Sequence, residues 1–156
     1  MKNFFFYDPK LLLYGFLIIF FASYGQTFFI SLFNTEIRKF YGLSDGEFGL
    51  VYAVATLLSS FLLISFAKLI DHLDLRLYSF IITLGFLFAC LGMVILINNI
   101  LYLFLVIFML RFFGQGAMDH AGGTTMARYF GNDKGKALSV ATLGGMIGVM
   151  FLPYFA

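Results

Sequence analysis

The sequence predicts an all-α integral membrane protein, built as a bundle of about five transmembrane helices. The chain has 156 residues, of which 62% are hydrophobic and 12% are charged, and its mean hydropathy is +0.96. Soluble domains are about 45–50% apolar and about 25% charged. Five apolar runs follow one another, each close to the roughly 20 residues that cross a bilayer. They leave no room for a soluble domain, so we expect a single transmembrane domain over residues 1–156.

The first span is predicted at about residues 11–33. Its apolar run is longer than the core of a signal peptide, which has about 7–15 residues, and no A-x-A cleavage site follows. We therefore expect a retained helix. The polar cluster from Ser23 to Thr27 gives its second half a polar face. This face fits either interhelical hydrogen bonding or the lining of a cavity, and both interpretations stay open.

Spans two and three are predicted at about residues 48–70 and 77–97. Ser44, followed three residues later by Glu47, fits a capping box that begins span two after a polar loop. The connection between the spans is crowded with ionisable side chains: Lys68, Asp71, His72, Asp74 and Arg76.

Span four, at about residues 100–126, contains an arginine near its middle. A charged side chain at the centre of a membrane helix costs about 2.5–3.5 kcal/mol on insertion scales. Arg111 should therefore face protein or a water-filled cavity. At about 100° per residue, Gln115 and Asp119 share the face of Arg111, whereas His120 points away. The small residues Gly114, Ala117, Ala121 and Thr125 form a second face suited to tight packing.

The polar residues of span four have more than one interpretation. Arg111 fits an anion anchor or one partner of a structural ion pair. Asp119 fits a proton site, a salt-bridge partner for Arg111 or a neighbouring helix, or a group reached by water. Span five is predicted at about residues 137–156. It contains residues that favour close helix packing: Gly144, Gly145, Gly148 and Pro153.

The sequence contains no enzyme motif: no G-x-S-x-G run, no Walker A run and no H-E-x-x-H run. Two histidines and the single Cys90 are dispersed, so we expect no metal site, and nothing indicates a cofactor. The expected partners are the lipid bilayer and a small-molecule solute, and no nucleic acid.

The distribution of lysine and arginine predicts the orientation in the membrane. One side would hold two of these residues, Arg38 and Lys39. The other would hold seven: Lys2, Lys10, Lys68, Arg76, Arg128, Lys134 and Lys136. Because cytoplasmic loops carry the excess, we expect a multi-pass protein of the cytoplasmic (inner) membrane with its N-terminus in the cytoplasm.

In three stretches the chain resembles the N-terminal part, helices one to five, of a major facilitator superfamily transporter. The connection 67–76 is similar to the loop motif G-x-x-x-D-R-x-G-R-R, which Asp71 and Arg76 match. The run Arg111 to Gly116 is similar to the fourth-helix motif, an intramembrane arginine followed by Gln-Gly. The glycines and the proline of span five resemble the glycine-rich, proline-ended fifth helix. The segment 111–145 also resembles the branch of monocarboxylate and oxalate/formate carriers.

The resemblance implies a secondary carrier with alternating access, in which two six-helix halves rock about a site near the membrane midplane. It implies that Arg111 and Gln115 line the substrate cavity, with Tyr24 and Gln26 of span one facing them, and we add Asp119 because it shares their face. It also implies that Asp71 and Arg76 take part in cytoplasmic gating contacts.

Five spans cannot enclose a two-lobed cavity. We therefore expect an incomplete N-terminal half of a twelve-helix carrier, or a chain that pairs with another chain. The solute would be a small organic molecule, an organic anion if Arg111 is an anion anchor, and Asp119 permits proton coupling. The alternative function is that of a small non-transporting membrane protein that assembles with other membrane subunits through its small-residue faces.

Overall fold

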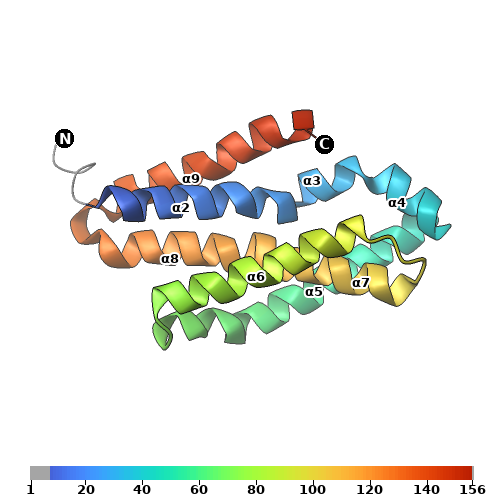
Figure 1. Ribbon diagram of the computed structural model, residues 1–156, viewed down its shortest axis with the longest axis horizontal. Coiled ribbons are helices and arrows are strands. Elements are labelled where there is room, and N and C mark those ends of the chain that lie inside the picture. The colour runs from blue at the N-terminus through green and yellow to red at the C-terminus, as the bar shows by residue number, and fades with distance from the viewer. Residues whose placement is uncertain (1–7, 156) are drawn as a thin grey trace.

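The computed structural model describes residues 8–155, and within that range five helices are long and apolar enough to cross a membrane. Consecutive spans run in opposite directions within one bundle (Figure 1). The predicted fold class is thereby confirmed, and each predicted span overlaps one of these helices. Lys2, which contributed to the predicted orientation, lies outside the described residues.

The first span is a chain of short helices rather than one continuous helix. It consists of α2 (Pro9–Ala22), a 3-10 turn (Ser23–Gly25) and α3 (Thr27–Leu32). The next residues form a further helix, α4 (Asn34–Tyr41), where the sequence indicated a polar loop. Ile37 of α4 is buried in a cluster of apolar side chains from spans two and four. That burial, which local polarity does not reveal, stabilises the extra helix.

Spans two and three are α5 (Asp45–Phe66), extended by a 3-10 turn (Ala67–Asp71), and α6 (Leu75–Val94). The predicted capping box is confirmed. The Glu47 amide donates to the Ser44 hydroxyl, and the Glu47 carboxylate accepts from the Ser44 amide.

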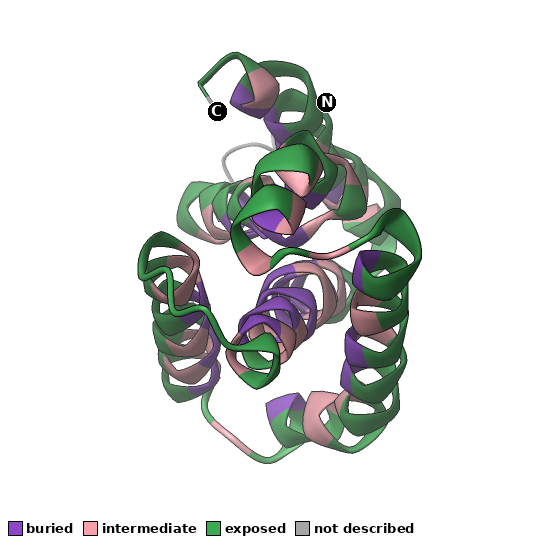
Figure 2. Cartoon of the chain, turned by 90° about the vertical axis from the view of Figure 1, so that its right-hand side faces the viewer, coloured by how far each residue is buried: buried purple, intermediate pink, exposed green. Residues whose placement is uncertain are grey.

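The fourth span consists of α7 (Ile100–Met109), a π-helical segment (Leu110–Met118) and α8 (Asp119–Tyr129). It is the most buried of the five spans. Seen along the bundle, the buried positions turn inwards and the exposed positions outwards (Figure 2). The fifth span follows a short turn (Gly131–Asp133). It consists of α9 (Lys134–Phe151) and a final 3-10 turn (Leu152–Phe155).

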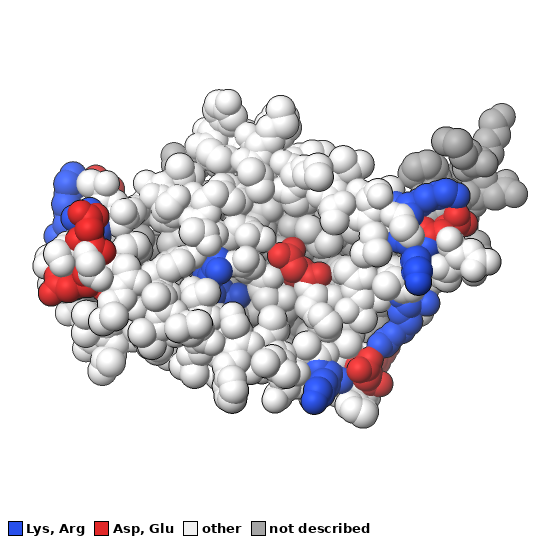
Figure 3. Space-filling view, turned by 180° about the vertical axis from the view of Figure 1, so that it is seen from behind, with Lys and Arg blue, Asp and Glu red and all other residues white. Residues whose placement is uncertain are grey.

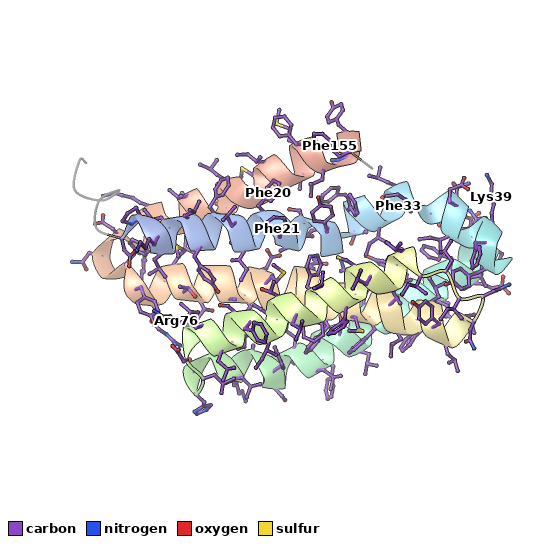
Figure 4. All side chains as sticks on the ribbon, viewed as in Figure 1. Phe20, Phe21, Phe33, Lys39, Arg76 and Phe155 are labelled. Atoms are coloured by element: carbon purple, nitrogen blue, oxygen red, sulfur yellow. The ribbon has the colours of Figure 1, made fainter. Side chains whose placement is uncertain are left out.

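The outer surface carries many large apolar side chains, as expected for contact with lipid. Leu57, Phe61 and Leu101 are each more than 70% exposed. Phenylalanine side chains also project from α2 (Figure 4). Arg76 and Lys39 lie at opposite ends of the bundle in the same view. The end at which α2 begins is called the N-terminal end below.

Candidate functional site

The first span is interrupted where its backbone touches the fourth span. Gln26 is extended, with φ −74° and ψ 153°, between the 3-10 turn and α3. Neighbouring serine and glycine residues are a common cause of such kinks, and Ser23 and Gly25 lie here. A Cβ atom on Gly25 would lie 2.5 Å from the carbonyl oxygen of Leu110. The interruption therefore brings the two backbones into direct contact, which only a glycine permits.

The fourth span is itself irregular at this contact. Residues Leu110–Met118 form a π-helix, a wider turn that occurs frequently at functional sites. A Cβ atom on Gly114 would lie 2.9 Å from the Cα atom of Gly25. The interrupted first span and the π-helical segment thus meet through a pair of glycines. The tight packing predicted for the small-residue face of span four is confirmed, since Gly114, Ala117, Ala121 and Thr125 are all buried.

Arg111 lies at this junction and is only 9% exposed. Its Nη1 atom donates to the carbonyl oxygen of Gly25 at 3.2 Å and to the Thr27 hydroxyl oxygen at 3.2 Å. Interrupting a helix frees backbone carbonyls from their intrahelical hydrogen bonds. Arg111 donates to the carbonyl next to the interruption, so its charge stabilises the irregular shape of span one.

Tyr52 of α5 completes the surroundings of the guanidinium. The Cζ atom of Arg111 lies 5.3 Å from the centroid of the Tyr52 ring, a cation–π distance. The Tyr52 hydroxyl donates to the Thr27 hydroxyl oxygen at 2.8 Å. Spans one, two and four therefore each contribute one of three side chains that contact one another: Thr27, Tyr52 and Arg111.

A cavity of about 230 Å³ opens beside Arg111, between α5 and the π-helical segment. Its lining residues are Ser59, Ser60, Leu63, Arg111, Gln115 and Gly116. The Nε atom of Arg111 and the Oε1 atom of Gln115 are buried and have no hydrogen-bond partner among residues 8–155. Buried polar groups are nearly always paired, so two unpaired atoms on residues that line one cavity make it a candidate binding site.

Asp119 lies one turn beyond the cavity. Its Oδ2 atom accepts a hydrogen bond from Nε2 of Gln26 at 3.1 Å, next to the interruption of span one. In the part of the chain that the structure describes, no ion pair joins Asp119 to Arg111. The salt-bridge interpretation is therefore wrong for the pair with Arg111, and Asp119 is instead a half-buried carboxylate held by a neutral amide.

These side chains lie on a face of the bundle that is open to the surface. We define the polar face as Gln26, Thr27, Ser60, Arg111, Gln115 and Asp119. Thr27 and Ser60 are exposed, and Gln26, Gln115 and Asp119 are half-buried. Figure 3 shows charged groups gathered at both ends of the molecule, with one small basic and one small acidic patch in an otherwise uncharged middle. The polar face thus interrupts a surface that is otherwise suited to lipid.

Tyr24 does not lie beside Arg111, which corrects its expected place in the cavity. Its ring packs edge-on against Phe29 at 4.9 Å and lines a separate apolar cavity of about 620 Å³ between span one and α6. Tyr24 lies in the 3-10 turn Ser23–Gly25, which has about three residues per turn, so side-chain directions calculated at about 100° per residue do not apply to it. Thr27 occupies the position beside Arg111 that was expected for Tyr24.

Three further residues of the site lie on span two, which the sequence did not single out for binding. Tyr52 packs on Arg111, and Ser59 and Ser60 line the cavity. Their spacing in the sequence indicates that they share one side of span two, because positions i, i+7 and i+8 fall on one face of a helix. His120 points elsewhere, as predicted, and pairs with the Thr124 hydroxyl at 3.4 Å.

The glycines of span five serve packing against span one. A Cβ atom on Gly144 would overlap the carbonyl oxygen of Phe16, and one on Gly148 would overlap the hydroxyl of Ser23. That hydroxyl donates to the carbonyl oxygen of Gly145 at 3.4 Å. Pro153 lies in the final 3-10 turn.

At the N-terminal end of the bundle, Asp71 and Arg76 do not contact each other. Asp71 forms an ion pair with Arg128 at the end of α8, and Arg128 also donates to the carbonyl oxygen of Ile70 at 3.2 Å. Arg76 instead lines an open groove with Lys10 and other residues of α2 and α6. Of these two residues, only Asp71 therefore links the connection between spans two and three to span four.

Comparison with known proteins gives one positive result. A family model described as Major Facilitator Superfamily matches residues 15–156, which is nearly the whole chain. No curated protein and no solved structure matches the chain.

Proposed function

The chain belongs to the major facilitator superfamily, whose members are secondary transporters and not enzymes, and on this basis we propose that it carries a small organic anion by alternating access. The observation that carries this proposal is the Nε atom of Arg111. It is buried and has no partner among the described residues, and the Arg111 side chain lines a cavity. A buried cation with a free donor favours a negatively charged ligand, because burial of an uncompensated charge is costly.

A carboxylate fits this arrangement better than a spherical anion. A guanidinium presents its N–H groups as a planar fork that can form two parallel bonds to one carboxylate. Nη1 is already committed to span one, so the edge that carries Nε remains for the solute. The open cavity of about 230 Å³ is the part of the solute site that these spans would contribute. We propose a small organic anion, of the kind that the resemblance to monocarboxylate and oxalate/formate carriers implies.

We further propose that other helices cover the polar face in the working carrier, whether from the second half of a twelve-helix transporter or from a partner chain. Polar side chains within membrane spans are almost always turned toward protein or a water-filled cavity, because contact with lipid costs several kcal/mol. Within residues 8–155, Thr27 and Ser60 of the polar face are exposed, and Gln26, Gln115 and Asp119 are only half-buried.

The excess of lysine and arginine supports an orientation with the N-terminal end of the bundle in the cytoplasm, within an inner membrane. In that orientation the ion pair of Asp71 with Arg128 lies on the cytoplasmic side. We propose that this pair, rather than a contact with Arg76, is the gating contact of the 2–3 connection.

Replacing Asp71 by asparagine is expected to slow transport while leaving the fold almost as stable as before. The Asp71 and Arg128 side chains are 55% and 43% exposed, and exposed pairs contribute only about 0–1 kcal/mol to stability. A thermal unfolding midpoint and a maximal uptake rate measured on the same preparation test this. The matched control is Asp45→Asn, which removes the pair with Arg38 at the opposite end. Equal rates for both variants would contradict a gating role for Asp71.

The alternative, a non-transporting membrane protein that assembles through small-residue faces, is less well supported by the packing. The glycines that would form such faces are used within the bundle. Gly85 packs against Phe113, and Gly122 packs against Ile19. Gly144 and Gly148 are used in the same way, whereas Gly46 and Gly49 at the start of α5 remain exposed.

Uptake by vesicles of the membrane that holds the protein tests the proposed function. We expect saturable uptake of short carboxylates, and no uptake of amides or amines of the same size, because only the carboxylate pairs with Arg111. We further propose proton coupling through Asp119, so a pH gradient with the acidic side outside should accelerate uptake.

The variant Asp119→Asn should lose this acceleration while keeping uptake without a gradient, because asparagine can still accept the hydrogen bond from Gln26 but cannot bind and release a proton. The control is Asp133→Asn, in the loop before α9. Equal uptake of the neutral amides would refute the anion proposal. If a pH gradient still accelerated uptake by Asp119→Asn as much as uptake by the wild type, Asp119 would not be the residue that couples transport to protons.

A further inference from the structure

We propose that Tyr52 and Thr27 are positioning residues, which hold the guanidinium of Arg111 so that its Nε edge faces the cavity. The solute-binding consequence rests on the proposed function, but the positioning itself does not. Neither residue lines the cavity, so neither touches a solute bound there. Both act through Arg111.

The three side chains form a closed set of contacts across three spans. The Thr27 hydroxyl oxygen accepts from Nη1 of Arg111 at 3.2 Å and from the Tyr52 hydroxyl at 2.8 Å. A hydroxyl oxygen has two lone pairs, so both bonds can form at once. The Tyr52 ring then lies 5.3 Å from the guanidinium carbon. Thr27 and Tyr52 thus each contact Arg111, and they are also hydrogen-bonded to each other.

This arrangement leaves one edge of the guanidinium for a ligand. Nη1 is fully used by Thr27 and the Gly25 carbonyl. One side of the group is near the Tyr52 ring. The Nε atom remains buried and without a partner among the described residues, and Arg111 lines the cavity.

A fixed guanidinium would bind a carboxylate more tightly than a mobile one. Arginine has many rotamers, and holding it in one of them during folding removes a cost that binding would otherwise bear. If Tyr52 and Thr27 only held the spans together, their loss would change stability without changing the motion of Arg111. The motion of the guanidinium is therefore the readout that separates the two roles.

Nitrogen NMR of the arginine side chains measures that motion directly. The chain has only four arginines, so the Nε–H signal of Arg111 is identified by its absence in Arg111→Lys. In the protein in lipid nanodiscs we expect a narrow Nε–H signal with slow solvent exchange. Thr27→Val and Tyr52→Phe should each speed that exchange by about 3- to 10-fold, the effect of losing one hydrogen bond. Thr27→Ser keeps the hydroxyl and should restore the slow exchange.

The matched control is Tyr102→Phe, because the Tyr102 hydroxyl donates to the Gly92 carbonyl at 2.8 Å, away from the three contacting side chains. This variant should leave the Arg111 signal unchanged. Exchange that stays slow in both Thr27→Val and Tyr52→Phe would overturn the proposal. So would exchange that speeds equally in Tyr102→Phe, since that would indicate general loosening.

A second measurement links positioning to solute binding. In vesicle uptake of propionate, Thr27→Val and Tyr52→Phe should raise the KM by about 3- to 10-fold with an unchanged maximal rate, and Thr27→Ser should restore the KM. A wild-type protein that neither binds nor carries a carboxylate would contradict the proposed function. The NMR result would still decide whether Tyr52 and Thr27 position Arg111.

Discussion

Replacing Arg111 by alanine is expected to abolish measurable carboxylate uptake. Each hydrogen bond to a charged group contributes about 1.5–3 kcal/mol, which corresponds to about 10- to 150-fold in affinity. The substitution removes the free Nε donor of the cavity. It also removes the bonds to Gly25 and Thr27, so the irregular shape of span one loses a support. Affinity and thermal unfolding must therefore be measured on the same preparation.

The variant Arg111→Lys separates these effects. Lysine keeps the positive charge and can still donate to the Gly25 carbonyl, but it lacks the planar fork. We expect it to fold with a similar thermal midpoint and to lose about tenfold or more in affinity for carboxylates. Arg76→Lys, at the start of α6, is the control for a loss of guanidinium geometry away from the cavity. Wild-type uptake by Arg111→Ala would refute the anchor role outright.

Replacing Gly144 by alanine is expected to destabilise the bundle more than any other glycine-to-alanine change that we propose. The added methyl group would overlap the backbone carbonyl oxygen of Phe16, at the interface of α2 and α9. Backbone cannot move aside as a side chain can, so the two helices must separate. Overpacking of this kind costs about 1–3 kcal/mol, and we expect the upper end. A lower thermal midpoint, or loss of the folded protein from detergent extracts, measures the effect.

Gly123→Ala provides the control on the neighbouring span. A Cβ atom there would meet only a Leu138 methyl group at 4.0 Å, an ordinary contact. Since alanine is favoured over glycine in a helix by about 1 kcal/mol, this variant should be as stable as the wild type or more stable. If Gly144→Ala were equally stable, the close packing of α2 against α9 would not be required for the fold.

Span one connects the parts of the site. Gln26 holds Asp119, Gly25 and Thr27 hold Arg111, and Phe16 lies against Gly144 of the fifth span. A shift of span one would therefore change the contacts of Arg111, the proposed anion anchor, and of Asp119, the proposed proton site, at the same time. This shared element is a physical route by which solute binding and protonation could influence each other.

The sequence allowed the polar residues of span four to be predicted as site residues, but not the residues that contact them. Arg111 and Gln115 were identified because charge and amide groups inside an apolar helix are costly, and that cost does not depend on the fold. The prediction for Tyr24 assumed a regular helix, whereas Tyr24 lies in a 3-10 turn, in which side chains follow a different angular period. Tyr52 was missed because a tyrosine in an apolar span has many uses, and only the contact with Arg111 selects one.

The sequence by itself determined the membrane location, the five helices and the presence of a buried charge, because hydrophobicity and charge act through transfer between water and lipid. The tertiary structure alone decided how that charge is held. The glycine contact between Gly25 and Gly114, the interruption of span one and the π-helical segment exist only when two distant backbones meet. Helical periodicity assumes regular helices, and at this contact neither span is regular.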